Sequence, residues 1–62
     1  MKVYKIMSAS KYFMEKFNSY YDYVYQDGES VLDKDYRNLK AEVRHFNIHV
    51  VHGPAIKIEK GK

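Results

Sequence analysis

One stretch of this 62-residue chain, residues 30–46, constrains the fold more than any other. Its apolar positions are separated by steps of 4, 3, 4 and 3, which places them in one stripe along a helix: Leu32, Tyr36, Leu39, Val43 and Phe46. Ser30 precedes the stripe at the position of an N-cap. Acidic residues follow in the first turn and basic residues in the last, as the helix dipole favours. We therefore predict a helix over residues 30–46.

The preceding segment, residues 11–26, carries a second helical pattern. Its apolar residues are separated by steps of 4, 3 and 4: Phe13, Phe17, Tyr20 and Val24. We predict a helix here, with Ser8 or Ser10 as its N-cap. Gly28 then ends this helix, and residues 27–29 connect it tightly to the next one.

A competing interpretation takes residues 20–26 as a strand. Tyrosines alternate with other residues along this segment, and Asp27-Gly28 is a hairpin turn signal. Pairing across that turn would set Asp22 against Asp33, and the repulsion between these like charges costs energy. We favour the helix and leave the hairpin open.

The hydrophobic period changes to two in three short segments, residues 2–7, 48–51 and 56–59, which predicts strands. Gly53-Pro54 marks a turn between the last two. The predicted fold class is α+β, a small two-layer β-α-α-β-β domain in which a helical hairpin packs on a three-stranded antiparallel sheet. We predict a single domain over residues 1–62, with residues 60–62 as a flexible tail. The strand residues expected to face the helices are Tyr4, Ile6, Ile48, Val50, Ile56 and Ile58.

The composition narrows the class of protein. The chain has no cysteine, which removes disulfides and thiolate metal sites and fits a reducing compartment. With 45% hydrophobic and 31% charged residues, the chain is expected to fold. No apolar run approaches the ~20 residues that span a bilayer, and no signal peptide is expected, because no apolar core follows Lys2 and Lys5. We expect a soluble cytoplasmic protein with no membrane association.

Three histidines, His45, His49 and His52, have the spacing H-x3-H-x2-H. A change from helix to strand near Asn47 is expected to separate them, so we predict no metal and no cofactor. The acidic residues in the middle of the chain do not match a calcium loop. A chain this short rarely encloses a pocket that could tune an acid–base pair. We therefore expect no enzymatic activity and no catalytic residues.

The chain has seven tyrosines, more than a core of this size can easily bury with their hydroxyl groups. Several fall outside the helical stripe, and tyrosine is typical of protein interfaces. Neighbouring acids would steer the chain towards a basic surface. We predict a non-enzymatic regulator or inhibitor, of the kind that phages and other mobile elements encode, that docks on a larger protein; a homodimer stays open. The predicted partner-binding residues are Tyr12, Tyr23, Tyr25, Asp22, Asp27 and Glu29.

The alternative prediction is a DNA-binding regulator. Arg37, Lys40 and Arg44 are spaced 3 and 4 apart and form a basic stripe beside the apolar one. With Lys57 on the following hairpin, they would contact phosphates, and the arginines could also read base edges. The opposing interpretation is a solvated face with intrahelical ion pairs, such as Asp33 with Arg37.

Two further features favour the alternative. Two helices followed by a β-hairpin form the outline of a winged helix-turn-helix. Residues 8–13, SASKYF, resemble the first-helix motif of small phage and transposon excisionases. That resemblance implies a DNA-binding role.

Overall fold

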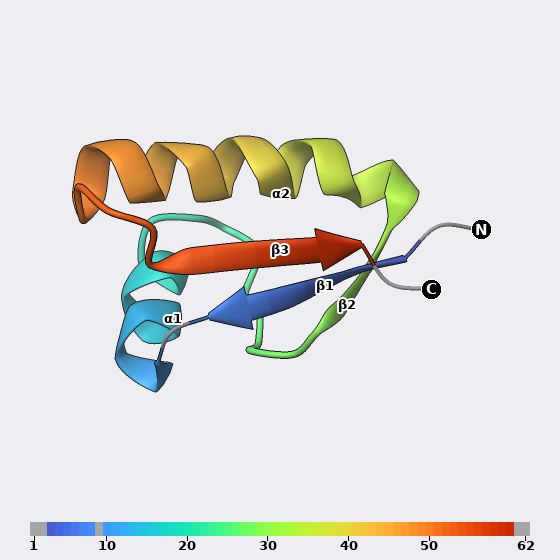
Figure 1. Cartoon of the computed structure of the whole chain (residues 1–62), viewed down its shortest axis with the longest axis horizontal. Helices are drawn as coiled ribbons and strands as arrows, with labels where there is room; N and C mark the ends of the chain where they lie inside the picture. The colour runs from blue at the N-terminus through green and yellow to red at the C-terminus, as the bar shows by residue number, and fades with distance from the viewer. Residues whose placement is uncertain (1–2, 9, 61–62) are drawn as a thin grey trace.

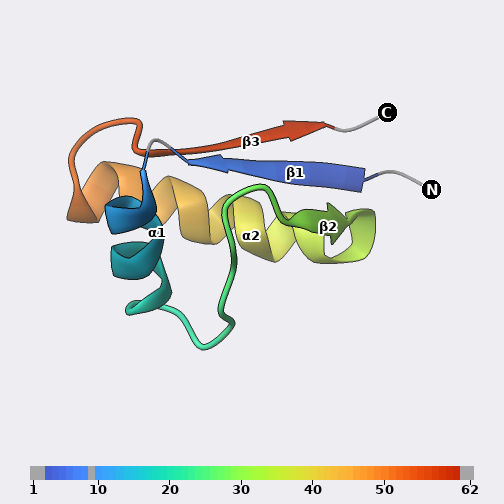
Figure 2. The same cartoon turned by 90° about the horizontal axis from the view of Figure 1, so that it is seen from below.

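β1 (Val3–Ser8) is the central strand of a three-stranded antiparallel sheet, and both helices pack against one face of that sheet (Figure 1, Figure 2). The computed structural model describes residues 3–8 and 10–60. The predicted α+β class, with two helices and a three-stranded antiparallel sheet, is confirmed. The other elements are α1 (Lys11–Asn18), β2 (Ser30–Leu32), α2 (Asp33–His45), the π-helical turn η1 (Phe46–Val50) and β3 (Ile56–Lys60).

The order of the elements differs from the prediction, because it is β-α-β-α-β in place of β-α-α-β-β. β2 and β3 flank β1, so the sheet order is β2-β1-β3. In the register, Tyr4 pairs with Val31, and Ile6 pairs with Ile58. The predicted helical hairpin is wrong, since β2 separates the two helices and α1 runs across the C-terminal end of α2 (Figure 1).

The predicted stripe of the second helix forms much of the core. Leu39, Val43 and Phe46 are buried, and the Tyr36 ring stacks on Tyr4 with ring centroids 3.6 Å apart. The helix begins at Asp33, three residues later than predicted. Residues 30–32 pair with β1 instead, so Ser30 is a strand residue rather than an N-cap, and Leu32 is partly exposed. Backbone pairing in the sheet therefore outweighs the capping signal.

Residues 46–50 continue the second helix, and the predicted strand over 48–51 is wrong. The amide of Val51 donates to the carbonyl of Phe46 at 3.1 Å, which closes a π-type turn. Val50 lies four residues after Phe46, so the helical stripe extends into η1 and Val50 packs against the core. Ile48 is 51% exposed because it lies off that stripe.

α1 ends at Asn18, eight residues before the predicted end. Its start agrees with the prediction, because Ser10 is the N-cap and its hydroxyl accepts from the Phe13 amide at 3.4 Å. At its end, the Ser19 hydroxyl donates to the Lys16 carbonyl at 2.6 Å. Such local side-chain bonds compete with helix propagation. Residues 19–29 form neither the predicted helix nor the competing strand, and Tyr20 and Val24 are exposed.

Gly28 makes the entry into β2 possible. It has φ +81°, and the Glu29 amide donates to the Gln26 carbonyl at 2.9 Å, which closes a tight turn. The Gly28 amide donates to the Ile6 carbonyl at 2.8 Å, and the Ile6 amide donates to the Glu29 carbonyl at 3.0 Å. Two residues of one strand thus oppose one of the other, which is a bulge with glycine in the left-handed position.

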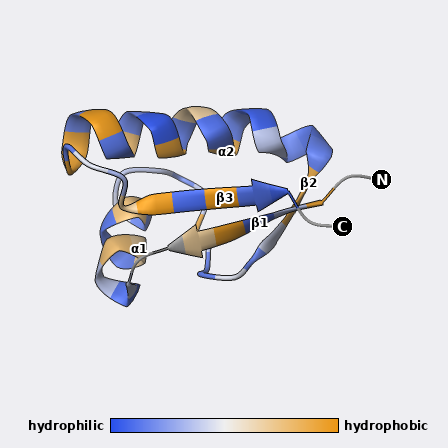
Figure 3. Cartoon of the chain, in the orientation of Figure 1, coloured by the Kyte–Doolittle hydropathy of each residue, from blue (hydrophilic) through white to orange (hydrophobic). Residues whose placement is uncertain are grey.

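β3 closes the other side of the sheet, and its residues alternate between hydrophobic and hydrophilic (Figure 3). Ile56 and Ile58 pack on the core, whereas Lys57 and Glu59 are exposed. Lys60 pairs with Tyr4, so the predicted tail over 60–62 is wrong at its first residue. Residues 61 and 62, and residue 2 of the predicted first strand, lie outside the described residues.

The largest fully buried side chains come from β1, α1, α2 and η1: Ile6, Phe17, Leu39 and Phe46. The Phe17 and Phe46 rings meet edge to face with centroids 5.2 Å apart. This contact joins α1 to the end of α2, and Ile6 supplies the sheet beneath it. The core therefore holds both helices on the same face of the sheet.

We predict that Gly28→Ala destabilises the protein by about 1 kcal/mol or more, because alanine disfavours the left-handed conformation. An added Cβ would lie 3.8 Å from Lys5 Cε, an ordinary contact, so the backbone conformation causes the loss. Thermal unfolding should show Tm lower by about 4–8 °C per kcal/mol. Gly53→Ala is the matched control, since a Cβ there meets nothing within 4 Å. Equal losses for both variants would contradict the assignment.

Candidate functional site

A groove of about 420 Å³ lies between the segment 23–32 and one flank of α2. Tyrosine and acidic side chains converge on it from both sides. We call it the acidic groove. It is lined by Tyr23, Tyr25, Glu29, Ser30, Val31, Leu32, Asp35, Asn38 and Glu42.

Asn18 holds the irregular wall of the acidic groove in place. Its side-chain amide donates to the Tyr25 carbonyl at 2.7 Å, and its Oδ1 accepts from the Tyr25 amide at 2.9 Å. The Tyr25 ring also packs on Phe17, with centroids 5.8 Å apart. The last residue of α1 thus anchors a residue seven positions later through two backbone hydrogen bonds, and Phe17 adds a ring contact.

Glu29 and Tyr23 complete this wall. Glu29 Oε2 accepts from the Gln26 amide at 2.7 Å, so the carboxylate caps the turn that leads into β2. The Tyr23 and Tyr25 rings lie 4.6 Å apart, and Tyr23 is 59% exposed. The aromatic surface of the acidic groove is therefore formed by one buried and one accessible tyrosine.

Glu42 lies on the opposite wall, and one oxygen of its carboxylate accepts no hydrogen bond from the described part of the chain. Its Oε2 is buried and has no hydrogen-bond partner among the residues that the structure describes. Burial raises the pKa of Glu42, the hydrogen bond with the Tyr25 hydroxyl opposes that rise, and the nearby charge of Asp22 adds to it. Burial, together with the adjacent carboxylate, raises the pKa of Tyr25 to about 12. The charged form of Glu42 is thus held where water solvates it poorly.

The structure brings only part of the predicted partner-binding set together. Tyr23, Tyr25 and Glu29 line the acidic groove, and Asp22 is close enough to influence Glu42. Tyr25 is 7% exposed, which corrects the expectation of a free interface tyrosine, because Asn18 and Phe17 draw it into the core.

The other two predicted residues lie outside the acidic groove. Tyr12 is 63% exposed on α1, beside Lys16 and Phe13. Asp27 occupies the turn before Gly28 and does not line the groove.

Three groove residues on α2 were not predicted from the sequence: Asp35, Asn38 and Glu42. Their spacing of 3 and 4 places them along one flank of the helix. The sequence therefore contains this polar stripe beside the apolar and basic ones. Which segment would face it depends on the irregular fold of residues 19–29.

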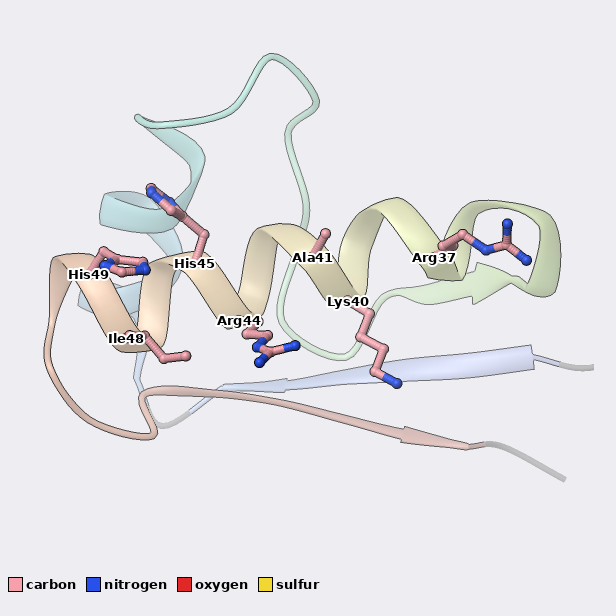
Figure 4. Close-up of a pocket in the computed structure, with 7 residues that line it drawn as sticks. All are labelled: Arg37, Lys40, Ala41, Arg44, His45, Ile48 and His49. Carbon is pink, nitrogen blue, oxygen red and sulfur yellow. The ribbon is translucent and has the colours of Figure 1, made fainter.

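The opposite flank of α2 carries a shallow hollow of about 420 Å³. Figure 4 shows Lys40, Arg44 and Ile48 pointing to one side of the helix and His45 to the other. We call this surface the basic face; its lining residues are Arg37, Lys40, Ala41, Arg44, His45, Ile48 and His49. The predicted stripe of three cations is therefore present and is extended by two histidines.

Lys57 does not join the other predicted nucleic-acid-binding residues. Its neighbours in β3, Ile56 and Ile58, face the helices, so Lys57 lies on the opposite face of the sheet. The predicted wing is also wrong, because residues 46–50 are helical and β3 pairs with β1. The winged helix-turn-helix outline is therefore wrong.

Two histidines share a helix face, contrary to the prediction of a break near Asn47. The rings of His45 and His49 lie 5.1 Å apart, and the Tyr21 hydroxyl lies 3.1 Å from His45 Nδ1. Within residues 3–8 and 10–60, no three histidine, cysteine or acidic side chains are grouped so as to hold a metal ion.

Over the same described part of the chain, no helix has the length and apolar character needed to cross a bilayer. No protein-family model matches this chain, and neither does any curated protein or solved structure.

We predict that Glu42→Gln raises the free energy of unfolding at pH 7 by less than about 1 kcal/mol, because it removes a poorly solvated charge whose energetic penalty is reduced by the remaining solvent exposure of the side chain. The raised pKa means that the folded state disfavours the carboxylate, so the penalty exists above the ordinary glutamate pKa and disappears below it. Urea unfolding at pH 7 and about pH 3 should show the gain only at pH 7. Glu15→Gln, on the exposed surface of α1, is the control and should show no such gain.

Proposed function

We propose that this chain is a non-enzymatic binding protein that docks on a larger protein through the acidic groove. The observation that carries the proposal is the convergence of two tyrosines with the carboxylates of Glu29, Asp35 and Glu42 on one groove. Tyrosines supply contact area at low entropic cost, and carboxylates attract a basic partner.

The partner chemistry follows from the unsatisfied carboxylate. A lysine or arginine that entered the groove could donate to Glu42 Oε2, which accepts no hydrogen bond from the described residues of the free protein. The same cation could lie against the exposed ring of Tyr23. We therefore propose that the partner presents a basic, arginine- or lysine-bearing segment.

A chain this small would act by covering a site on its partner. Its accessible surface is 4652 Å². A standard interface of about 800 Å² on each side would use roughly a sixth of that surface. We propose steric inhibition or regulation in the cytoplasm, which is the compartment that the cysteine-free composition predicts, and a phage or another mobile element as the source.

We expect a benzophenone amino acid at position 23 to crosslink a specific protein in cells of the source organism. Position 12 is the matched control, since Tyr12 and Tyr23 are exposed to a similar degree. The same probe there should not crosslink the protein, because Tyr12 lies outside the acidic groove. Mass spectrometry of the crosslinked product identifies the partner. A product formed from position 12 alone would contradict docking through the groove.

The recovered partner then allows a charge test. Glu42→Gln should weaken its binding by tenfold or more while the variant remains folded, because the carboxylate that meets the partner's cation is removed. Glu15→Gln is again the matched control. If binding is unchanged in Glu42→Gln and does not weaken with salt, the acidic groove is not the docking site.

A further inference from the structure

The basic face of α2 and η1 carries cations without the acids that commonly neutralise them. Among the described residues, no carboxylate lines the hollow. The ion pair between Asp33 and Arg37, on which the opposing interpretation of this face relied, is absent, and among residues 3–8 and 10–60 the salt bridge found joins Lys11 to Glu15 on α1. The Lys40 ammonium lies 5.9 Å from the centroid of the Tyr36 ring. Because this ring is uncharged, the contact does not neutralise the positive charge of Lys40. Arg37 and Arg44 are exposed and available to an anion.

The cations are spread along the helix rather than gathered at one point. At 1.5 Å per residue, Arg37 and Arg44 lie about 10 Å apart along the axis, and the face continues beyond them to His49, about 18 Å from Arg37. Figure 4 shows Arg37 at one end of the face and His49 at the other. A single phosphate could not reach all of these groups, whereas a polymer with regularly spaced phosphates could.

The carboxylates of the acidic groove face away from this array. At 100° per residue, Glu42 is about 200° around the helix from Arg44, and Asp35 is about 200° from Arg37. A polyanion on the basic face would therefore meet the cations without approaching the acidic groove.

We propose that the basic face binds duplex DNA, with α2 and η1 lying along the groove and backbone of the double helix. Arg37, Lys40 and Arg44 contact phosphates, and the arginines are able to reach guanine edges. Ala41 stands between Lys40 and Arg44, and Ile48 follows Arg44 by one turn, where small and aliphatic groups suit thymine methyls. None of the described tyrosines or phenylalanines lines this face, which favours a duplex over a single strand, since single strands are bound by stacking on aromatic rings.

The test is fluorescence anisotropy with a labelled duplex of about 20 base pairs, measured between about 50 and 200 mM salt. We expect the double variant Arg37→Gln, Arg44→Gln to bind at least tenfold more weakly. It should also reduce the slope of log affinity against log salt by about 2, because each substituted arginine no longer neutralises a phosphate. The matched control is the double variant Lys5→Gln, Lys57→Gln, which removes the same charge from the opposite face of the sheet.

Three results would overturn the proposal. They are no binding at about 50 mM salt, equal weakening in the two double variants, and displacement of the duplex by polyglutamate as readily as by unlabelled duplex. The second result would mean attraction to net charge alone, and the third would assign the basic face to an acidic protein. None of the three bears on the acidic groove, whose test uses other residues.

Discussion

The edge-to-face contact between Phe17 and Phe46 joins the two helices, and the acidic groove depends on it. Each ring is fully buried, and truncating a buried phenylalanine costs about 3–5 kcal/mol, a large share of the stability of a chain this small. α1 ends one residue after Phe17, so the contact also fixes the position of Asn18. Asn18 in turn holds Tyr25 at the wall of the acidic groove. Without the packing of these two rings, the groove would become disorganised along with the core.

Two asparagine side chains hydrogen-bond to backbone groups that helices and strands do not satisfy in this fold. Asn18, at the end of α1, bonds both backbone groups of Tyr25. Asn47, in η1, accepts from the amides of Ala55 and Ile56 and donates to the Ile56 carbonyl, all within 3.1 Å. Each side chain reaches seven to nine residues ahead and holds the chain within or beside an irregular segment. A side-chain amide offers a donor and an acceptor together, which suits it to this task.

These asparagine hydrogen bonds explain which parts of the fold the sequence could predict and which it could not. Local periodicity was sufficient for α2, since Leu39, Val43 and Phe46 repeat at helical spacing and are buried. The same spacing extends to Val50, but residues 48–51 also alternate with a period of two, and that local pattern predicts a strand. The path of 19–29 and the exit from η1 depend on asparagine hydrogen bonds that join residues seven to nine positions apart, beyond the spacing of a helix turn or a strand repeat. No local pattern encodes them, so the acidic groove could be predicted only in part, through its tyrosines and Glu29.

The burial of one stripe of α2 also determines on which sides of the helix its charged residues are exposed. Leu39 and Val43 pack in the core, so the acidic flank and the basic flank lie on opposite sides of this buried stripe. Residues 19–29 close the acidic side into a groove, whereas the basic side stays open. A helix with its side chains is about 10–12 Å across, more than the Debye length of about 8 Å at physiological salt. The acidic groove therefore hardly repels a polyanion on the basic face under those conditions, and one helix can present two surfaces of opposite charge that act independently.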